Sequence, residues 1–224
     1  LADPDGKRAN TKDNTPAIIH HQIVPGDTVD IHVAAKGGGS EAKSKFAMLN
    51  PSDSVVDWVM EQLPKMGAGW CPPGMLGIGI GGTAEKAMMI AKEALQARGP
   101  SNRAEEIRLE LFDKVNKSGI GAQGLGGLTT VLDIKVKDYP THAANKPVAI
   151  IPNCAATRHA HFTLDGTGPA ALKAPKLEDW PEITREAGDN VKRVNLDTVT
   201  PAEVKTWQPG DTLLLNGKLL TGRD

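Results

Sequence analysis

The amino-acid sequence predicts an α+β fold, in which a mixed sheet with flanking helices is followed by the start of a second β-rich domain. Two observations support this class. Helical and strand patterns mix along the chain without the strict alternation of a doubly wound parallel sheet. Beyond a stretch rich in Gly, Pro and Lys, the pattern changes to short strands. We therefore divide the chain into the central part of an N-terminal domain (1–164), a connector (165–190) and the start of a C-terminal domain (191–224).

The first elements expected along the chain are a pair of strands and a helix. Apolar and polar residues alternate over 16–35, which predicts two strands around a turn at Pro25-Gly26-Asp27. An apolar stripe at helical spacing predicts a helix over 52–63. Ser52 or Ser54 can cap its first turn, and the proline that follows is expected to end it.

The remaining elements follow from the same two periodicities. These patterns predict, in order, a strand over 75–80, helices over about 84–97 and 103–116, and strands over 128–136 and 147–151. Thr83 is the expected N-cap of the first of these helices. Near the end of the chain, Asn216-Gly217 between apolar residues predicts a two-residue hairpin.

Charge and composition exclude several classes of function. The chain carries 26 Lys and Arg against 27 Asp and Glu, a formal net charge of −1, which gives no support to binding of nucleic acid or of a membrane surface. No apolar stretch approaches the roughly 20 residues of a membrane span. Two cysteines are too few for a disulfide scaffold, which favours a reducing, cytoplasmic location.

The two cysteines are the strongest candidates for chemistry. Cys71 follows Gly69-Trp70 and precedes two prolines, and Cys154 follows Pro152-Asn153, so both lie in tight turns beside apolar runs. A thiolate on a rigid turn is a good metal ligand because its position is set before the metal arrives. Two thiolates do not fill a tetrahedral site, so further ligands would come from elsewhere. The alternative is an inert, buried cysteine.

Two glycine motifs have competing interpretations. Gly77-x-Gly79-x-x-Gly82 matches the dinucleotide fingerprint formally, but its first two glycines lie inside the predicted strand. Close packing is therefore favoured over a dinucleotide-binding oxidoreductase. The run Lys36-Gly37-Gly38-Gly39-Ser40 is either a flexible loop or a nest whose backbone N–H groups bind an anion.

The histidines give a weaker signal. His159-Ala160-His161 would place both imidazoles on one side of a strand, yet no neighbouring ligand spacing supports zinc, so polar loop histidines are favoured. His142 lies 12 positions before Cys154 in a predicted turn.

Six blocks of the sequence resemble the class I fumarate hydratases, the oxygen-sensitive iron–sulfur hydro-lyases whose wider family includes tartrate dehydratase. They cover almost the whole chain in the family's order: Asn10–Ala17, Ala35–Glu41, Gly67–Gly74, Ile78–Ala87, Gly119–Gly127, and Leu215–Lys218 with Gly222–Asp224.

The resemblance implies a [4Fe-4S] cluster held by three cysteines. Cys71 and Cys154 match the second and third ligands, while the segment with the first ligand is absent from this chain. It also implies substrate contacts from the backbone of Gly39, from His142 and from Arg223. The family's acid–base groups match no residue here, so the catalytic residues stay unassigned.

The expected function is reversible hydration of fumarate to L-malate with the cluster as Lewis acid. L-Tartrate or mesaconate as substrate, and a non-catalytic metal-binding module, are the alternatives. Because the chain continues past the connector, it resembles single-chain members, which are more often fumarases. The resemblance also suggests a homodimer. The chain reads as an internal fragment, which we expect to be inactive alone.

Overall fold

The computed structural model describes residues 1–96, 102–156, 158–170, 191–208 and 211–220, with the single residues 172, 176, 178 and 181. The chain separates into two compact units, Leu1–Leu172 and Lys173–Asp224. Within the described residues, no helix is both long enough and apolar enough to cross a membrane.

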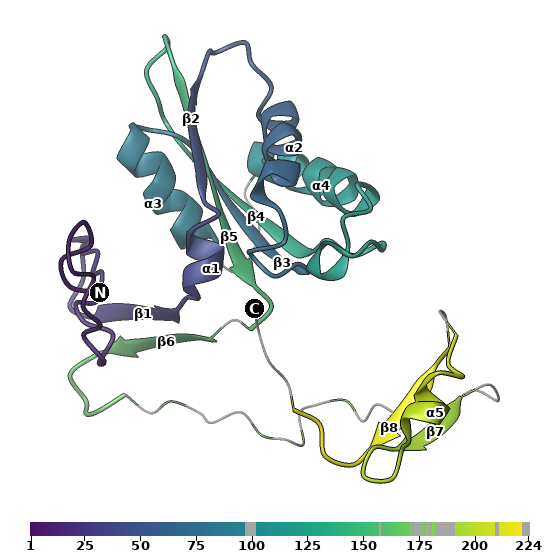
Figure 1. Ribbon diagram of the computed structural model, residues 1–224. Helices are drawn as coiled ribbons and strands as arrows, with labels where there is room; N and C mark the ends of the chain where they lie inside the picture. The colour runs from purple at the N-terminus through teal and green to yellow at the C-terminus, as the bar shows by residue number, and fades with distance from the viewer. Residues whose placement is uncertain are drawn as a thin grey trace. The chain divides into compact units, whose positions relative to one another are not determined.

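A four-stranded mixed sheet forms the centre of the first unit. Its order is β2 (Lys45–Leu49), β5 (Lys146–Cys154), β3 (Gly74–Gly81) and β4 (Val131–Tyr139). β3 and β4 are parallel, whereas β5 runs antiparallel to both of its neighbours. Helices α2 (Val55–Met66) and α4 (Asn102–Lys117) lie on one face, and α3 (Ala84–Ala94) lies on the other (Figure 1). The predicted α+β class, with a mixed sheet flanked by helices, is confirmed.

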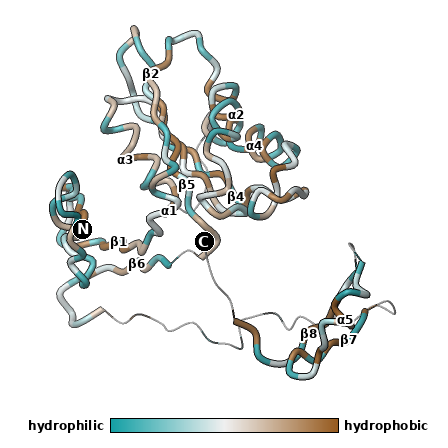
Figure 2. Tube along the Cα trace, in the orientation of Figure 1, coloured by the Kyte–Doolittle hydropathy of each residue, from teal (hydrophilic) through white to brown (hydrophobic). Residues whose placement is uncertain are grey.

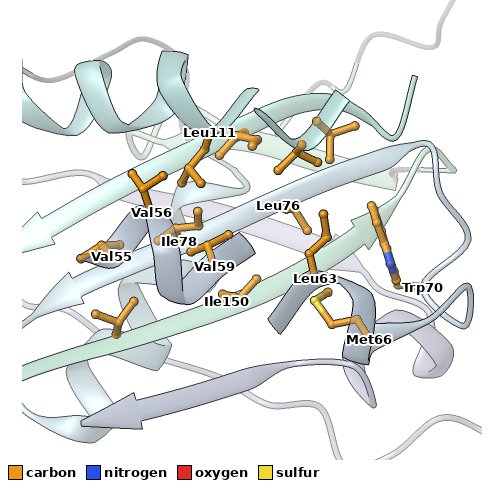
Figure 3. Packing of buried hydrophobic residues seen from close by; sticks show 14 residues of the cluster. Val55, Val56, Val59, Leu63, Met66, Trp70, Leu76, Ile78, Leu111 and Ile150 are labelled. Carbon is orange, nitrogen blue, oxygen red and sulfur yellow. The ribbon is translucent and has the colours of Figure 1, made fainter. Parts of the chain in front are cut away.

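The main core lies between the sheet and the pair α2 and α4. Figure 3 shows Val59 and Leu63 of α2 facing Ile78 of β3 and Ile150 of β5, all essentially excluded from solvent. Each large apolar side chain buried in this way contributes about 1.5–3 kcal/mol. Hydrophobic residues accordingly concentrate where helices meet the sheet (Figure 2).

The opposite face of β3 carries Gly77 and Gly79 and packs directly on α3. A Cβ atom on Gly77 would lie 2.1 Å from the carbonyl oxygen of Ala91, and one on Gly79 would lie 2.0 Å from that of Ala87. Real Cβ atoms do not approach so closely, so only glycine lets this helix lie so near the strand. The favoured interpretation of Gly77-x-Gly79-x-x-Gly82 as a packing motif is confirmed.

Helix α2 begins and ends three residues later than predicted. Its first turn is capped by Ser54, whose hydroxyl accepts a hydrogen bond from the backbone N–H of Asp57 at 3.1 Å. The prediction that the proline ends the helix was wrong, because Pro64 lies inside it and the last residue is Met66. A proline has no backbone N–H, so in the last turn it removes one hydrogen bond of the helix. The helix tolerates this loss at its end, because the last carbonyl groups of any helix have no partner within it.

A separate two-stranded ribbon pairs β1 (Val29–Ala35) with β6 (Arg158–Leu164) in antiparallel register. The prediction of two strands around Pro25-Gly26-Asp27 was half wrong, because residues 16–24 form no strand. Alternation marks residues that can form a strand but does not name the partner, and here the partner lies about 130 residues away, as in the pair His32 and His161.

The second unit contains β7 (Lys192–Asn195), α5 (Pro201–Val204) and β8 (Leu213–Asn216). β7 and β8 pair in parallel. The structure shows no hairpin at Asn216-Gly217, because the described residues after β8, 217–220, form no strand, and the partner of β8 is β7. Gly217 still has the positive φ, 122°, that such a turn residue favours.

Candidate functional site

Cys71 lies in the loop between α2 and β3. Its backbone has a φ of 60°, an uncommon value for a residue other than glycine, and its N–H donates to the carbonyl of Ala68 at 2.9 Å. The preceding Trp70 is buried in the main core beside Met66 (Figure 3). This anchor and the turn together hold the half-buried Cys71 thiol in a defined place.

Cys154 is the last residue of β5, and the sheet brings it to the Cys71 loop. In the β3–β5 pairing, Cys154 lies opposite Gly74, only three residues after Cys71. A Cβ on Gly74 would lie 3.3 Å from the Cα of Cys154 and 3.0 Å from the Trp70 ring. The end of β5 and the start of β3 thus lie side by side at one end of the sheet (Figure 1). The structure gathers both sequence-predicted ligands there.

The glycine run borders the same end of the sheet. It forms the short helix α1 (Gly38–Glu41), not a flexible loop, and a Cβ on Gly39 would lie 2.9 Å from the carbonyl oxygen of Gly69. The first N–H groups of a helix have no partner within it and can face an anion. None of these glycines has the positive φ of an alternating backbone nest, so any anion contact would come from a helical turn.

Sequence reasoning missed the ionic contacts that hold α1. The ammonium of Lys36 lies 2.9 Å from one carboxylate oxygen of Glu41, and that of Lys92 on α3 lies 2.9 Å from the other. Burial acts to raise the pKa of Glu41, but the hydrogen bonds from Lys92 and Lys36 outweigh it, so the pKa lies below its ordinary value. Burial lowers the pKa of Lys36, and Glu41 opposes that shift.

A second glycine-rich loop, 119–127, supports the Cys71 turn. The backbone N–H and the side-chain amide of Gln123 both donate to the carbonyl of Pro72, at 2.6 and 3.3 Å. Gly121 and Gly124 adopt positive φ, and a Cβ on Gly121 would lie 2.0 Å from the carbonyl oxygen of Gly126. The many glycines of this loop could have indicated a tightly folded loop, but no structural role was assigned to Gln123 or to the loop from the sequence.

His142 lies at the opposite end of the sheet from the cysteines. Next to it, Thr141 donates through its hydroxyl to the carbonyl of Gly82 at 2.9 Å, just beyond the far end of β3. The nine residues of β5 separate the two ends by about 27 Å. Within one copy of the chain, His142 therefore does not reach Cys154. It lines an open cleft of about 780 Å³ with Lys86, whose ammonium lies 4.9 Å from the centre of the Tyr139 ring.

The remaining candidates are Arg223 and the two histidines of β6. Arg223 lies outside the described residues. His159 and His161 lie on strand β6 and not in a loop, so that part of their interpretation was wrong. The ring of His161 stacks on that of His32 with centres 3.9 Å apart, and burial lowers the pKa of His159. In the part of the chain that the structure describes, no three His, Cys, Asp or Glu side chains form a metal-binding group.

Comparisons with known proteins give two adjoining family matches. The family model described as Fumarate hydratase (Fumerase) matches residues 1–163. The model described as Fumarase C-terminus matches residues 166–224.

Curated relatives carry two kinds of name. A candidate L(+)-tartrate dehydratase subunit alpha of Methanocaldococcus jannaschii is 42% identical over 59% of this chain and 49% of its own length. Fumarate hydratase 2 of Leishmania major is 31% identical over 97% of this chain and 42% of its own length. The aerobic class I fumarate hydratase of Escherichia coli is 29% identical over 97% of this chain and 44% of its own length. The chain thus spans about half the length of these relatives.

Proposed function

This chain belongs to the fumarate hydratase family, and from that premise we propose that the full-length protein is a hydro-lyase that interconverts fumarate and L-malate. One observation favours fumarate. The two family matches follow one another in a single chain, and the relatives named fumarate hydratase align with 97% of it. The relatives named tartrate dehydratase subunit alpha align with 59% and 70% of it.

The proposal includes a [4Fe-4S] cluster at the end of the sheet where β5 and the Cys71 loop meet. The donor set fits in part: Cys71 and Cys154 are half-buried thiols brought to one place by the β3–β5 pairing, and thiolates are the ligands that such clusters take. When bound, the group supplies Lewis-acid chemistry that assists departure of a hydroxyl group. A reducing, cytoplasmic location suits thiols with this role.

The chain's own residues would hold the dicarboxylate. α1 packs against the loop that carries Cys71, since a Cβ on Gly39 would lie 2.9 Å from the carbonyl oxygen of Gly69, and we assign one carboxylate contact to the backbone N–H of Gly39. We assign a second carboxylate contact to Arg223, because a guanidinium binds a carboxylate through two parallel hydrogen bonds. The groups that transfer the proton are not assigned to any residue of this chain.

The function is tested by fumarate hydration, followed through its ultraviolet absorbance, with the full-length protein reconstituted without oxygen. We expect turnover that is lost on exposure to air and regained on anaerobic reconstitution with iron and sulfide. A protein that holds an intact cluster and does not hydrate fumarate would contradict the proposal. Turnover unaffected by air and by removal of iron would contradict the role of the cluster.

L-Tartrate is the second candidate substrate. Its support is the 42% identity, over 59% of this chain, to the relative from Methanocaldococcus jannaschii. The two dicarboxylates differ in hydroxyl groups, and a site built to hydrogen-bond a hydroxyl discriminates strongly against a substrate that lacks it. The same assay with L-tartrate and mesaconate in place of fumarate therefore ranks the three substrates by kcat/KM.

His142 is assigned to substrate binding, and its position sets a condition on that role. Since the length of β5, about 27 Å, lies between the end of the sheet near His142 and Cys154, His142 would have to serve the cysteines of a second copy. The proposed homodimer meets this condition. We expect His142→Ala and Cys154→Ser each to be inactive as pure dimers, and mixed dimers of the two to regain activity, because one site then has both residues intact.

The control for this experiment is each variant dissociated and reassociated with itself, which should stay inactive. Mixed dimers without recovered activity, despite confirmed exchange of copies, would contradict the assignment of His142 to a neighbouring site.

A further inference from the structure

The side chain of Lys36 is a confined cation next to α1. It follows β1, precedes α1 and is 13% exposed. Its ammonium contacts the Glu41 carboxylate at 2.9 Å and the Ser40 hydroxyl at 3.1 Å. Ser40 is itself buried, and its hydroxyl donates to the carbonyl of Gly37 at 3.0 Å, so its oxygen lone pairs remain for Lys36. These contacts determine where the charge lies.

The single negative charge of Glu41 does not fully neutralise Lys36, because Glu41 also pairs with Lys92. Lys92 binds the other oxygen of the same carboxylate, so two ammonium ions share one negative charge and one net positive charge remains. Lys92 is more exposed, at 36% of its side chain, and its charge is therefore better screened by water. The less screened charge is therefore that of Lys36.

Lys36 lies close enough to Cys154 for their charges to interact. The packing agrees, because α1 contacts β5, and Gly39 touches the loop that carries Cys71. Keeping a lysine charge away from water costs free energy unless negative charge nearby offsets it. Glu41, shared with Lys92, offsets only part of it.

We propose that Lys36 is a positioning residue of the site, which holds α1 in place and supplies positive charge to the anionic groups that gather at Cys71 and Cys154. This inference rests on the proposed function, in which those groups are cysteine thiolates and a dicarboxylate. A fixed cation in a partly buried site stabilises such anions more than the same charge in water. Lys36 makes no bond to a reacting atom in this role.

The test compares Lys36→Met with Lys92→Met in the reconstituted full-length protein. Both remove one cation from the same carboxylate, so they are matched in the ion pair that is lost. We expect Lys36→Met to lower the reduction potential of the cluster and to raise KM for the dicarboxylate about tenfold, with a smaller change in kcat. Lys92→Met should change neither appreciably, and Lys36→Arg should retain the potential because it keeps the charge.

A double variant distinguishes two roles of Lys36: neutralising Glu41, or supplying positive charge to the site. If Lys36 serves only to neutralise Glu41, then Lys36→Met combined with Glu41→Gln should restore the potential and KM in full, and this outcome would overturn the proposal. We expect incomplete restoration, because the net positive charge then lies on Lys92, which is more exposed and better screened by water. Equal effects of Lys36→Met and Lys92→Met would overturn it as well.

Measuring the reduction potential allows this inference to be tested separately from the proposed function. An unmodified protein that assembles the cluster but turns over no dicarboxylate would refute the proposed function, while the shift in potential would still report the charge of Lys36. An active enzyme whose potential and KM ignore Lys36 would refute only the inference.

Discussion

Replacing Cys154 with serine in the full-length protein should leave no assembled iron–sulfur cluster. Fumarate turnover should fall by more than about a hundredfold, which exceeds the loss caused by removing a residue that only supports a ligand. Serine keeps the size of the side chain, so the end of β5 should still pair with β3. Its oxygen is a hard and weakly acidic ligand where iron–sulfur chemistry takes a soft thiolate. Iron and acid-labile sulfide per chain, with the visible absorbance of the cluster, measure the result.

A matched control is available on the neighbouring strand. Met75 is paired with Asn153, next to Cys154, and is partly buried. Met75→Leu conserves volume, so we expect near-normal cluster content and a small loss of stability. Cys71→Ser should behave like Cys154→Ser. Normal iron and sulfide in either cysteine variant would refute the ligand assignment.

Replacing Gly79 with alanine should lower the free energy of unfolding by about 3 kcal/mol, or prevent folding outright. The added Cβ would lie 2.0 Å from the carbonyl oxygen of Ala87 and 2.7 Å from the backbone nitrogen of Ala91. Both atoms belong to the backbone of α3, so no side chain can rotate away, and the helix would have to leave the sheet. Chemical denaturation of the full-length protein, followed by circular dichroism, measures the loss.

Gly38→Ala is the control for Gly79→Ala. A Cβ on Gly38 has no heavy atom within 4 Å, and the residue lies in a helical turn. Alanine is the better helix former, so this variant should be neutral or slightly stabilising. Equal stabilities of the two variants would mean that α3 does not pack on β3 as closely as described, and would reopen the interpretation of Gly77-x-Gly79-x-x-Gly82.

Several elements could be predicted from the sequence because their signals are local. The stripe of α2, its cap at Ser54 and the glycine-interrupted strand β3 each depend on neighbours within a few residues. The elements predicted wrongly depend on a distant partner. Strand β1 pairs with β6 and not with residues 16–24, and β8 pairs with β7 and not with the residues that follow it.

The candidate site divides in the same way. The sequence pointed to Cys71, Cys154 and the glycine run as individual residues, because rigid turns and glycine are visible locally. It did not point to Lys36 with Glu41 or to Gln123 at the Pro72 carbonyl, because those contacts form only when separate loops pack together. Nothing in the spacing of charges identifies such a pair before the fold is known.

By itself, the sequence determined the type of most main elements, though not of strands β2 and β6, and which residues have the chemistry of ligands. Only the tertiary structure decided which of them meet. The antiparallel pairing of β3 with β5 brings Cys71 and Cys154 together across about 80 residues. His142 precedes the first residue of β5 and therefore lies at the opposite end of the sheet. Periodicity is set by the local geometry of helix and strand, whereas strand pairing is set by the apolar surface that the whole sheet buries, which no short stretch of sequence contains.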